Sequence, residues 1–181
     1  MLLYSERFLF YTNITMKKTE KDTYYISEAI KQSQVSIDAG GYPCGAIIVR
    51  HDEIIATGIS NGKNAYDATM HAEIDAIQKA SQKLQSRSLE GCTLYTSMEP
   101  CIMCFSAAFW AYIPRIVYSC ARSQVDTDYY MGEHDIVAMN QKNYRRKIEL
   151  LHYSDSSQNA LQIIYAWEKI NSNEQTQCHL N

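Results

Sequence analysis

The stretch CGAIIVRHDEIIATG (residues 44–58) contains two apolar runs rich in β-branched side chains, separated by the polar pair His51-Asp52. Such runs predict two paired strands, over 44–50 and 53–58, that form a hairpin. A loop rich in Asn, Gly and Asp follows and leads into HAEIDAIQKASQKL (71–84), whose apolar residues recur at helical spacing. The sequence therefore predicts a hairpin followed by an amphipathic helix.

Helical and strand patterns continue to alternate on both sides of this segment. A helical pattern over 24–38 precedes it and stops at Gly40-Gly41. Strands that alternate with helices of about 10–15 residues indicate an α/β fold with helices on both faces of one sheet. The other predicted elements are a strand over 92–97, a helix opened by Pro100 and running through Ala111, strands over 115–119 and 147–151, and a helix from Ser157 to about Ile170.

The composition is that of one globular domain. The chain has 181 residues, of which 46% are hydrophobic and 20% charged. We expect an N-terminal arm over 1–20, a domain over 21–171 and a flexible tail over 172–181. Glu6 and Arg7 interrupt the apolar start, which therefore resembles neither a signal peptide nor a membrane span. The six cysteines then predict no disulfide scaffold, and we expect a cytoplasmic protein without membrane contact.

The charge pattern gives no reason to expect a nucleic acid partner. The formal net charge is −3, so the chain as a whole does not attract phosphate backbones. The basic residues Lys142, Arg145, Arg146 and Lys147 form a short run, which is typical of a solvated face.

Cys101 and Cys104, in the motif PCIMC, together with His71 have the residue types of a zinc site. Residues three apart share a helix face, so both thiols can reach one ion. With Pro100 at the first helical position, both cysteines would lie in the first turn, where the positive helix end favours thiolates. Three protein ligands are typical of a catalytic zinc, which keeps a fourth position for water and lowers the pKa of that water from about 15.7 toward about 7.

Glu73 follows His71 closely and is the predicted acid/base. The two side chains converge only if they lie at the start of the helix, and the polar loop before Thr69 places them there. Glu73 then shares the apolar stripe of Ala76, Ile77 and Ala80, which turns its carboxylate toward the core. Burial of an unpaired carboxylate is costly, and a proton-transferring role is the simplest compensation.

At these residues the sequence resembles the cytidine and deoxycytidylate deaminase superfamily, whose signature is HxE followed by PCxxC. The resemblance covers about residues 24–120. It implies a three-layer α/β/α sandwich with a mixed sheet of about five strands, a zinc cofactor, hydrolytic release of ammonia and a homodimer. Within the superfamily the chain is most similar to bacterial guanine deaminases, which implies a small-molecule purine substrate and conversion of guanine to xanthine. The segments that carry this similarity are GAIIV (45–49), TMHAEIDAI (69–77), LYTSMEPCIMC (94–104) and AFWA (108–111).

The resemblance also implies substrate contacts. Trp110 would line the base pocket, the amide of Asn61 would fix the base edge, and the backbone of Ala46 would hold the base from the other side. Asp126 is the candidate for a further polar contact. A turn role for Asn61 and a core role for Trp110 are the alternatives. Cys44, Cys92 and Cys120 are interpreted as core-filling residues.

Other functions stay open at this point. A tRNA adenosine deaminase would need a basic final helix, whereas Lys169 is the only lysine or arginine in residues 157–181. Another nucleoside or nucleobase deaminase is compatible with the same motifs. A non-catalytic zinc-binding module is the alternative from a different class, and it would give Glu73 no role.

Overall fold

The structure is a computed structural model of the chain and describes residues 18–130, 132, 134–143 and 146–178. Among these residues, no helix combines the length and the apolar content that a membrane crossing needs. The helices are α1 (Glu20–Asp38), α2 (Gly62–Ala65), α3 (Ala72–Leu84), α4 (Ile102–Trp110), α5 (Ile136–Lys142) and α6 (Ser157–Cys178), with short 3-10 turns η1 (Arg122–Gln124), η2 (Thr127–Tyr129) and η3 (Ser154–Ser156). The strands are β1 (Gly45–Arg50), β2 (Glu53–Ile59), β3 (Cys92–Met98), β4 (Arg115–Cys120) and β5 (Glu149–His152).

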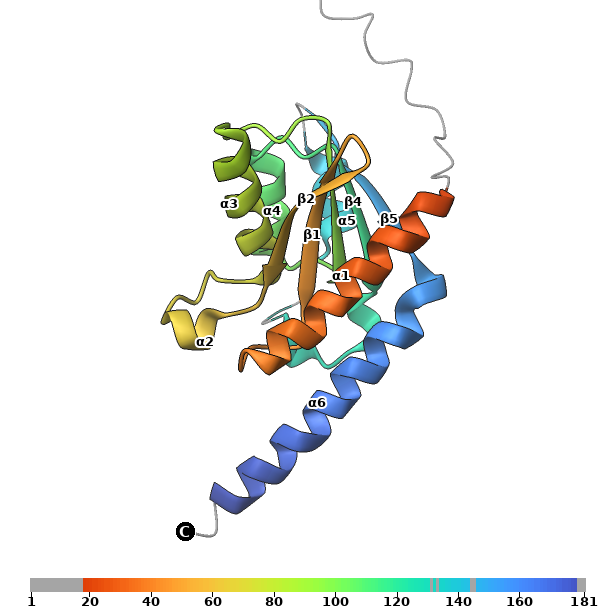
Figure 1. Cartoon of the computed structure of the whole chain (residues 1–181). Coiled ribbons are helices and arrows are strands. Elements are labelled where there is room, and N and C mark those ends of the chain that lie inside the picture. The colour runs from red at the N-terminus through yellow and green to blue at the C-terminus, as the bar shows by residue number, and fades with distance from the viewer. Residues whose placement is uncertain (1–17, 131, 133, 144–145, 179–181) are drawn as a thin grey trace, which may run out of the picture.

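The five strands form one mixed sheet in the order β2-β1-β3-β4-β5. Strand β1 is antiparallel to both β2 and β3, whereas β3, β4 and β5 are parallel to one another. Helices α3, α4 and α5 cover one face, and α1 and α6 cover the other (Figure 1). The predicted three-layer α/β/α sandwich with a mixed sheet of five strands is confirmed.

The position of β1 between two helical layers explains why its sequence is almost continuously apolar. Ala46 and Ile48 belong to the core under α3 and α4, while Ile47 and Val49 belong to the core under α1. Side chains alternate between the two faces of a strand, so a strand covered by helices on both sides needs apolar residues at every position. The predicted hairpin and its two strands therefore agree with the structure to within one residue.

Helix α3 is held closely against β2 at Gly58. A Cβ atom at this position would overlap the backbone of Ala72 and Ala76, so glycine is what allows the helix to approach the strand. The loop that carries α2 joins the end of β2 to the start of α3. The close packing thereby places His71 and Glu73, at the start of α3, next to the end of β2.

Three predicted helix ends differ from the structure by two residues or more, and the first of these helices, α1, begins at Glu20 rather than at residue 24. Helix α4 begins at Ile102 rather than at Pro100, and Cys101 is its N-cap. Helix α6 continues to Cys178 instead of ending near Ile170, so most of the predicted tail over 172–181 is helical. The polar sequence after Ile170 lacks an apolar stripe, which removes the sequence signal for a helix, but it contains neither proline nor glycine to end one. Residues 1–17 of the predicted arm lie outside the described residues.

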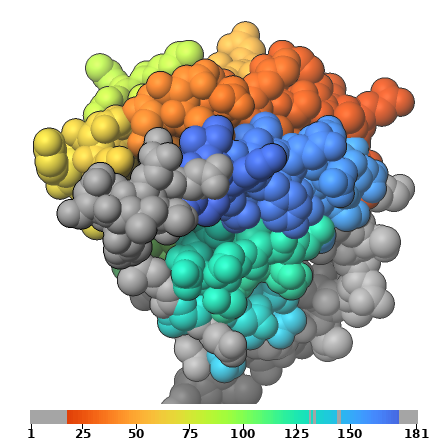
Figure 2. Space-filling model, turned by 90° about the horizontal axis from the view of Figure 1, so that it is seen from below, coloured from red at the N-terminus to blue at the C-terminus, as the bar shows by residue number. Residues whose placement is uncertain are grey.

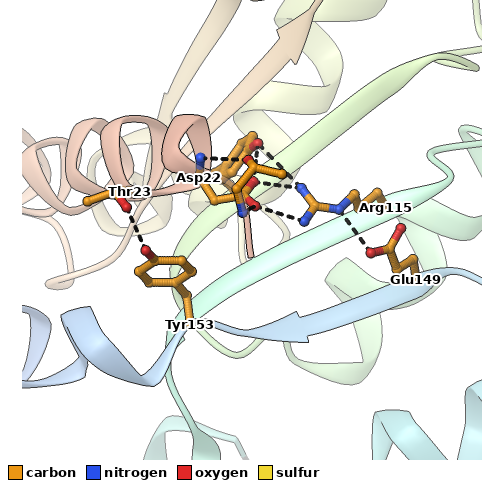
Figure 3. A network of polar contacts seen from close by, with 7 residues as sticks. Asp22, Thr23, Arg115, Glu149 and Tyr153 are labelled. Atoms are coloured by element: carbon orange, nitrogen blue, oxygen red, sulfur yellow. Dashed lines mark hydrogen bonds and ion pairs between the residues drawn. The ribbon is translucent and has the colours of Figure 1, made fainter. Parts of the chain in front are cut away.

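A buried network of polar contacts attaches α1 to the sheet (Figure 3). The two oxygen atoms of Asp22 accept hydrogen bonds of 2.7 and 3.0 Å from Arg115 of β4, and Tyr95 of β3 donates one of 2.8 Å. Asp22 also completes a capping box with Thr19 at the start of α1. Arg115 in turn lies 3.2 Å from a carboxylate oxygen of Glu149 on β5. One carboxylate therefore caps the helix and anchors it to the sheet.

The ionisation of Asp22 should be visible in the stability of the protein. Burial would raise the pKa of Asp22, but hydrogen bonds from Arg115, the backbone of Thr19 and Tyr95 outweigh it and lower this pKa from 3.8 to about 2. A carboxyl with a depressed folded-state pKa stabilises the protein above its unfolded pKa, and this stabilisation is lost as the pH falls through the folded pKa. We expect a loss of roughly 2 kcal/mol in the free energy of unfolding between about pH 4 and pH 2.

Urea unfolding of the parent and of Asp22→Asn over this pH range measures the effect. The variant leaves Arg115 as a buried charge without its main partner, so we expect it to be about 3–5 kcal/mol less stable at neutral pH. The difference between the two proteins should shrink as the pH falls, because only the parent loses the ionised Asp22. Two stability curves that run parallel down to pH 2 would contradict this account.

Candidate active site

Two helix N-termini meet at the predicted metal ligands. His71 is the N-cap of α3 and Cys101 is the N-cap of α4, while Cys104 lies in the first turn of α4. The Nδ1 atom of His71 is 3.6 Å from the Sγ atom of Cys101 and 3.6 Å from that of Cys104, and the two sulfur atoms are 3.6 Å apart. The structure thus brings the three side chains together, as a group that we call the metal trio.

The geometry of the metal trio fits one tetrahedral zinc ion. Zinc–sulfur bonds of about 2.3 Å and zinc–nitrogen bonds of about 2.0–2.1 Å place two sulfur ligands about 3.8 Å apart and a sulfur and a nitrogen about 3.6 Å apart. The observed separations of 3.6 Å are close to both values. Thiolate and imidazole are also the ligand types that zinc prefers, so His71, Cys101 and Cys104 form a His/Cys/Cys zinc site.

The surroundings of Cys101 favour its ligand form. A hydrogen bond from the Cys104 thiol lowers the pKa of Cys101 to about 4; burial opposes this shift, and a hydrogen bond from His71 adds to it. The positive N-terminus of α4 also favours a thiolate at this position. The site therefore provides a deprotonated sulfur near neutral pH.

Glu73 lies beside the metal trio and is buried, with 3% of its surface exposed. One carboxylate oxygen accepts a hydrogen bond of 3.4 Å from the Cys104 thiol, and the other accepts one of 3.4 Å from the hydroxyl of Thr96. Burial raises the pKa of Glu73, and the negative charge of Cys101 raises it further. A carboxyl group with a raised pKa next to a metal site is suited to take up and release a proton near neutral pH.

A pocket of about 810 Å³ opens in front of the metal trio, within the range of small-molecule sites. Its floor contains His71, Glu73 and Cys101. Its walls come from the loop before β1, the end of β2, residues 126, 128–130 and 134, and the middle of α6. Seen from below, α6 lies between α1 and the segment that follows β4, so the last helix borders the pocket (Figure 2).

Asp126 is the predicted substrate contact that the structure brings to this pocket. Its side chain also accepts a hydrogen bond of 2.9 Å from the backbone of Asp128 and so caps η2. Asn61 does not line the pocket, because its side-chain oxygen accepts a hydrogen bond from Asn64 and its backbone closes the loop onto Met70. Ala46 is fully buried within the sheet and does not line the pocket either.

The structure places Trp110 outside the lining of this pocket, and its contact with substrate stays a prediction. Helix α4 starts at the metal trio and ends at Trp110, and nine residues of helix span about 13 Å. The side chain of Trp110 is 78% exposed and does not line the pocket, so it is not a core residue either. The apolar character of α4 gave no information on which end of the helix faces the site.

The pocket wall also contains residues that no sequence pattern predicts. Tyr42 and Trp167 line the pocket with their ring centroids 5.4 Å apart, and Tyr129 donates a hydrogen bond of 3.0 Å to Glu168, which also lines it. These residues come from three segments that are distant in the sequence. Trp167 and Glu168 lie within the predicted last helix. A helical pattern alone does not reveal which face of α6 lies against the site.

Cys44, Cys92 and Cys120, the three cysteines predicted to fill the core, differ in their surroundings. Cys92 and Cys120 are fully buried, as expected for core-filling residues. Cys44 instead lines the pocket and accepts a weak contact of 3.9 Å from the hydroxyl of Ser97. Cys44 is partly buried and packs against two of the core clusters, so it combines the predicted core role with a place in the pocket lining.

The basic run near residue 146 contributes to the fold. The guanidinium of Arg146 donates hydrogen bonds to the carbonyl oxygens of Ile113, Ala108 and Phe109 at the C-terminus of α4. The ammonium of Lys147 likewise donates to carbonyl oxygens at the end of α5. Helix C-termini leave carbonyl groups without partners and attract cations, so both residues act as helix caps. Lys142 and Lys147 are exposed, as expected of a solvated face, and Arg145 lies outside the described residues.

Comparison with known proteins places this site in a family. The model of the cytidine and deoxycytidylate deaminase zinc-binding region matches residues 19–120, which is more than half of the chain. This region contains the metal trio and Glu73, and its boundaries agree with the similarity expected from the motifs.

Individual relatives carry different names. The chain is 38% identical over 96 residues to a "tRNA-specific adenosine deaminase" of Aquifex aeolicus, which covers 53% of this chain and 64% of the relative. It is 43% identical over 100 residues to a "Probable cytosine deaminase" of Schizosaccharomyces pombe, which covers 55% of this chain and 60% of the relative. The chain thus spans less than two thirds of both curated relatives.

A solved structure is similar over a longer part of the chain. The guanine deaminase of Bacillus subtilis is 30% identical, with a TM-score of 0.56, over 81% of this chain and 93% of that protein. The shared fold extends beyond the matched zinc-binding region. With its His/Cys/Cys site and adjacent buried glutamate, the chain belongs to the family of the cytidine and deoxycytidylate deaminase zinc-binding region.

Proposed function

We propose that the chain catalyses the zinc-dependent hydrolytic deamination of an amino-bearing nucleobase or nucleoside, with guanine to xanthine and ammonia as the leading reaction. The observation that carries the proposal is the buried carboxyl of Glu73, within hydrogen-bonding distance of Cys104 in the metal trio and at the floor of the pocket. A non-catalytic zinc module would have no use for a buried carboxyl group at this place.

His71, Cys101 and Cys104 would hold the zinc ion, which supplies a nucleophile from water at neutral pH. Glu73 would take one proton from the attacking water and give it to the ring nitrogen of the base; it would then take the proton of the hydroxyl group newly bonded to the ring carbon and give it to the departing amine, so that the carbon–nitrogen bond breaks, ammonia leaves and the carboxylate is restored. Burial keeps the carboxyl group away from bulk water, and the Thr96 hydroxyl orients it. The chain would thereby supply both the metal ligands and the proton carrier of the reaction.

The choice of guanine is supported by two observations. The segments GAIIV (45–49) and TMHAEIDAI (69–77) resemble bacterial guanine deaminases, and the Bacillus subtilis guanine deaminase is similar over most of its length. Asp126 lines the pocket, where its carboxylate is suited to accept hydrogen bonds from the N–H groups of a purine. The names of the curated relatives keep cytosine and tRNA adenosine as alternatives, but Arg146 and Lys147 are engaged as helix caps and give no support to tRNA binding.

Ammonia release from a panel of substrates tests this proposal. The panel contains guanine, adenine, cytosine, their nucleosides and a tRNA anticodon stem-loop, each with the zinc-loaded protein and with chelated protein. We expect guanine to be turned over fastest, no turnover after chelation, and recovery when zinc is added back. If another compound of the panel is deaminated instead, guanine is the wrong substrate but the proposed reaction type holds. If no compound releases ammonia, the proposal is rejected. The predicted homodimer is a separate part of the proposal, and light scattering of the purified protein tests it.

A further inference from the structure

The pocket carries an unusual excess of negative charge, and this inference about its substrates rests on the proposed function. Its lining includes the carboxylates of Asp126, Asp128 and Glu168 at the rim, which we call the acidic collar. Glu73 and Glu99 add two more carboxyl groups deeper in the pocket. Within the described part of the chain, no lysine or arginine lines the pocket.

One arginine lies near the pocket wall without lining the pocket. The guanidinium of Arg122 lies 5.6 Å from the ring centroid of Tyr130, a lining residue, but it donates hydrogen bonds to the carbonyl oxygens of Gly132 and His134. Glu99 accepts a hydrogen bond of 3.0 Å from the backbone of Arg122 and so uses its carboxylate to hold the same loop. Arg122 therefore holds this loop and does not line the pocket, so it offers no direct contact to a phosphate there.

The collar has a defined geometry. Tyr129 donates a hydrogen bond of 3.0 Å to Glu168 across the pocket wall, which fixes the carboxylate on α6 relative to η2. Asp126 and Asp128 belong to η2 and its N-cap, so all three carboxylates are held by ordered elements. Tyr42 and Trp167 add an aromatic surface on the same side. This combination of carboxylates and aromatic rings suits amino groups, hydroxyl groups and flat rings.

Phosphate binding needs the opposite arrangement. Phosphate sites use arginine, lysine or free helix N-termini, and the two helix N-termini at this site already face the metal trio. A volume of about 810 Å³ has room for more than a base, so size alone does not exclude a nucleotide. Charge is then the property that separates a nucleoside from its phosphorylated form.

We propose that the acidic collar restricts the enzyme to free bases and unphosphorylated nucleosides, and that Asp128 and Glu168 determine the rejection of nucleoside monophosphates. Ribose hydroxyl groups can donate hydrogen bonds to these carboxylates, whereas a 5′-phosphate is repelled by them. The repulsion acts at short range in a partly enclosed pocket, where added salt weakens it.

The substrate panel first identifies the base that is deaminated. The test then compares the nucleoside of that base with its 5′-monophosphate. We expect kcat/KM to be at least about 100-fold lower for the monophosphate than for the nucleoside, because like charges placed together strongly suppress the wrong partner. The double variant Asp128→Asn/Glu168→Gln should reduce this ratio about tenfold, mainly through KM for the monophosphate. The matched control Glu53→Gln/Glu90→Gln removes the same charge from exposed positions at the opposite end of the sheet and should keep the parent ratio.

Calorimetric binding of the nucleoside and the monophosphate to the zinc-loaded protein separates this inference from the proposed function. Preferred binding of the nucleoside that disappears in the collar variant supports the inference even when no ammonia is released. Equal or tighter binding of the monophosphate, binding of neither compound, or the same ratio in the collar and control variants would overturn it. A panel without turnover rejects the proposed function alone.

Discussion

Replacing Glu73 by glutamine is expected to lower kcat by about 10²–10⁴-fold, the range typical of losing a positioned general acid/base. Glutamine has nearly the same size and keeps a hydrogen-bond acceptor for Thr96, but it cannot carry a proton. Glu73 is not a member of the metal trio, so the zinc content should stay at the parent level. Steady-state kinetics and metal analysis of the same preparation measure both quantities.

A second acid on the same helix provides the control for this experiment. Asp75 is also buried, but it accepts hydrogen bonds from the backbone of Ile59 and from Lys79 and does not line the pocket. We expect Asp75→Asn to keep kcat within a few-fold of the parent. The hydrogen bonds of Asp75 attach α3 to β2, so their loss should lower the stability of the protein rather than its activity. Full activity in Glu73→Gln would remove Glu73 from the mechanism and would favour a non-catalytic zinc module.

Substitution of Cys104 by alanine should have a still larger effect, because it removes a metal ligand. Cys104 is fully buried and lies 3.6 Å from both other members of the trio, so no exposed side chain can take its place without rearrangement. We expect zinc content well below one ion per chain and a loss of activity of at least about 10⁴-fold. Enzymes usually accelerate their reactions by more than about 10⁶-fold, so a loss of this size is measurable. Metal analysis and ammonia release measure the two losses.

The same substitution at Cys92 separates metal loss from packing loss. Cys92 is equally buried, but it lies at the start of β3 in the core under α3 and α4. Cys92→Ala should lose stability as a small cavity forms, while its zinc content stays at the parent level. A Cys104→Ala protein that retains a full zinc ion, or a Cys92→Ala protein that loses it, would mean that the ligand assignment is wrong.

The sequence predicts the chemistry of the site better than its walls, and the reason is distance along the chain. His71 and Glu73 are two residues apart at the start of one helix, and Cys101 and Cys104 are three apart at the start of another. Local rules for helix starts are enough to orient such pairs. The similarity of HxE and PCxxC to a known family then indicates that the two pairs meet.

The walls depend on tertiary packing, which leaves no local pattern. Tyr42 precedes β1 and Trp167 lies on α6, and their rings meet only because α1 and α6 cover the same face of the sheet. The length of α6 also depends on a polar sequence without periodicity. The pocket role of Trp110 was implied by the resemblance to guanine deaminases, whereas in this structure Trp110 lies at the end of α4 away from the metal trio and is exposed.

The residues that carry the chemistry come from the first part of the chain, whereas the pocket wall is built from both parts. The zinc ligands and Glu73 all precede residue 121, whereas Asp126, Asp128, Trp167 and Glu168 all follow it. During evolution, mutations in the later part can therefore change which molecule is accepted while the reaction itself is preserved. Relatives that share the first part and differ in the second would then diverge in substrate without inventing new chemistry, and chimeric genes joined after β4 offer a direct way to exchange selectivity in the laboratory.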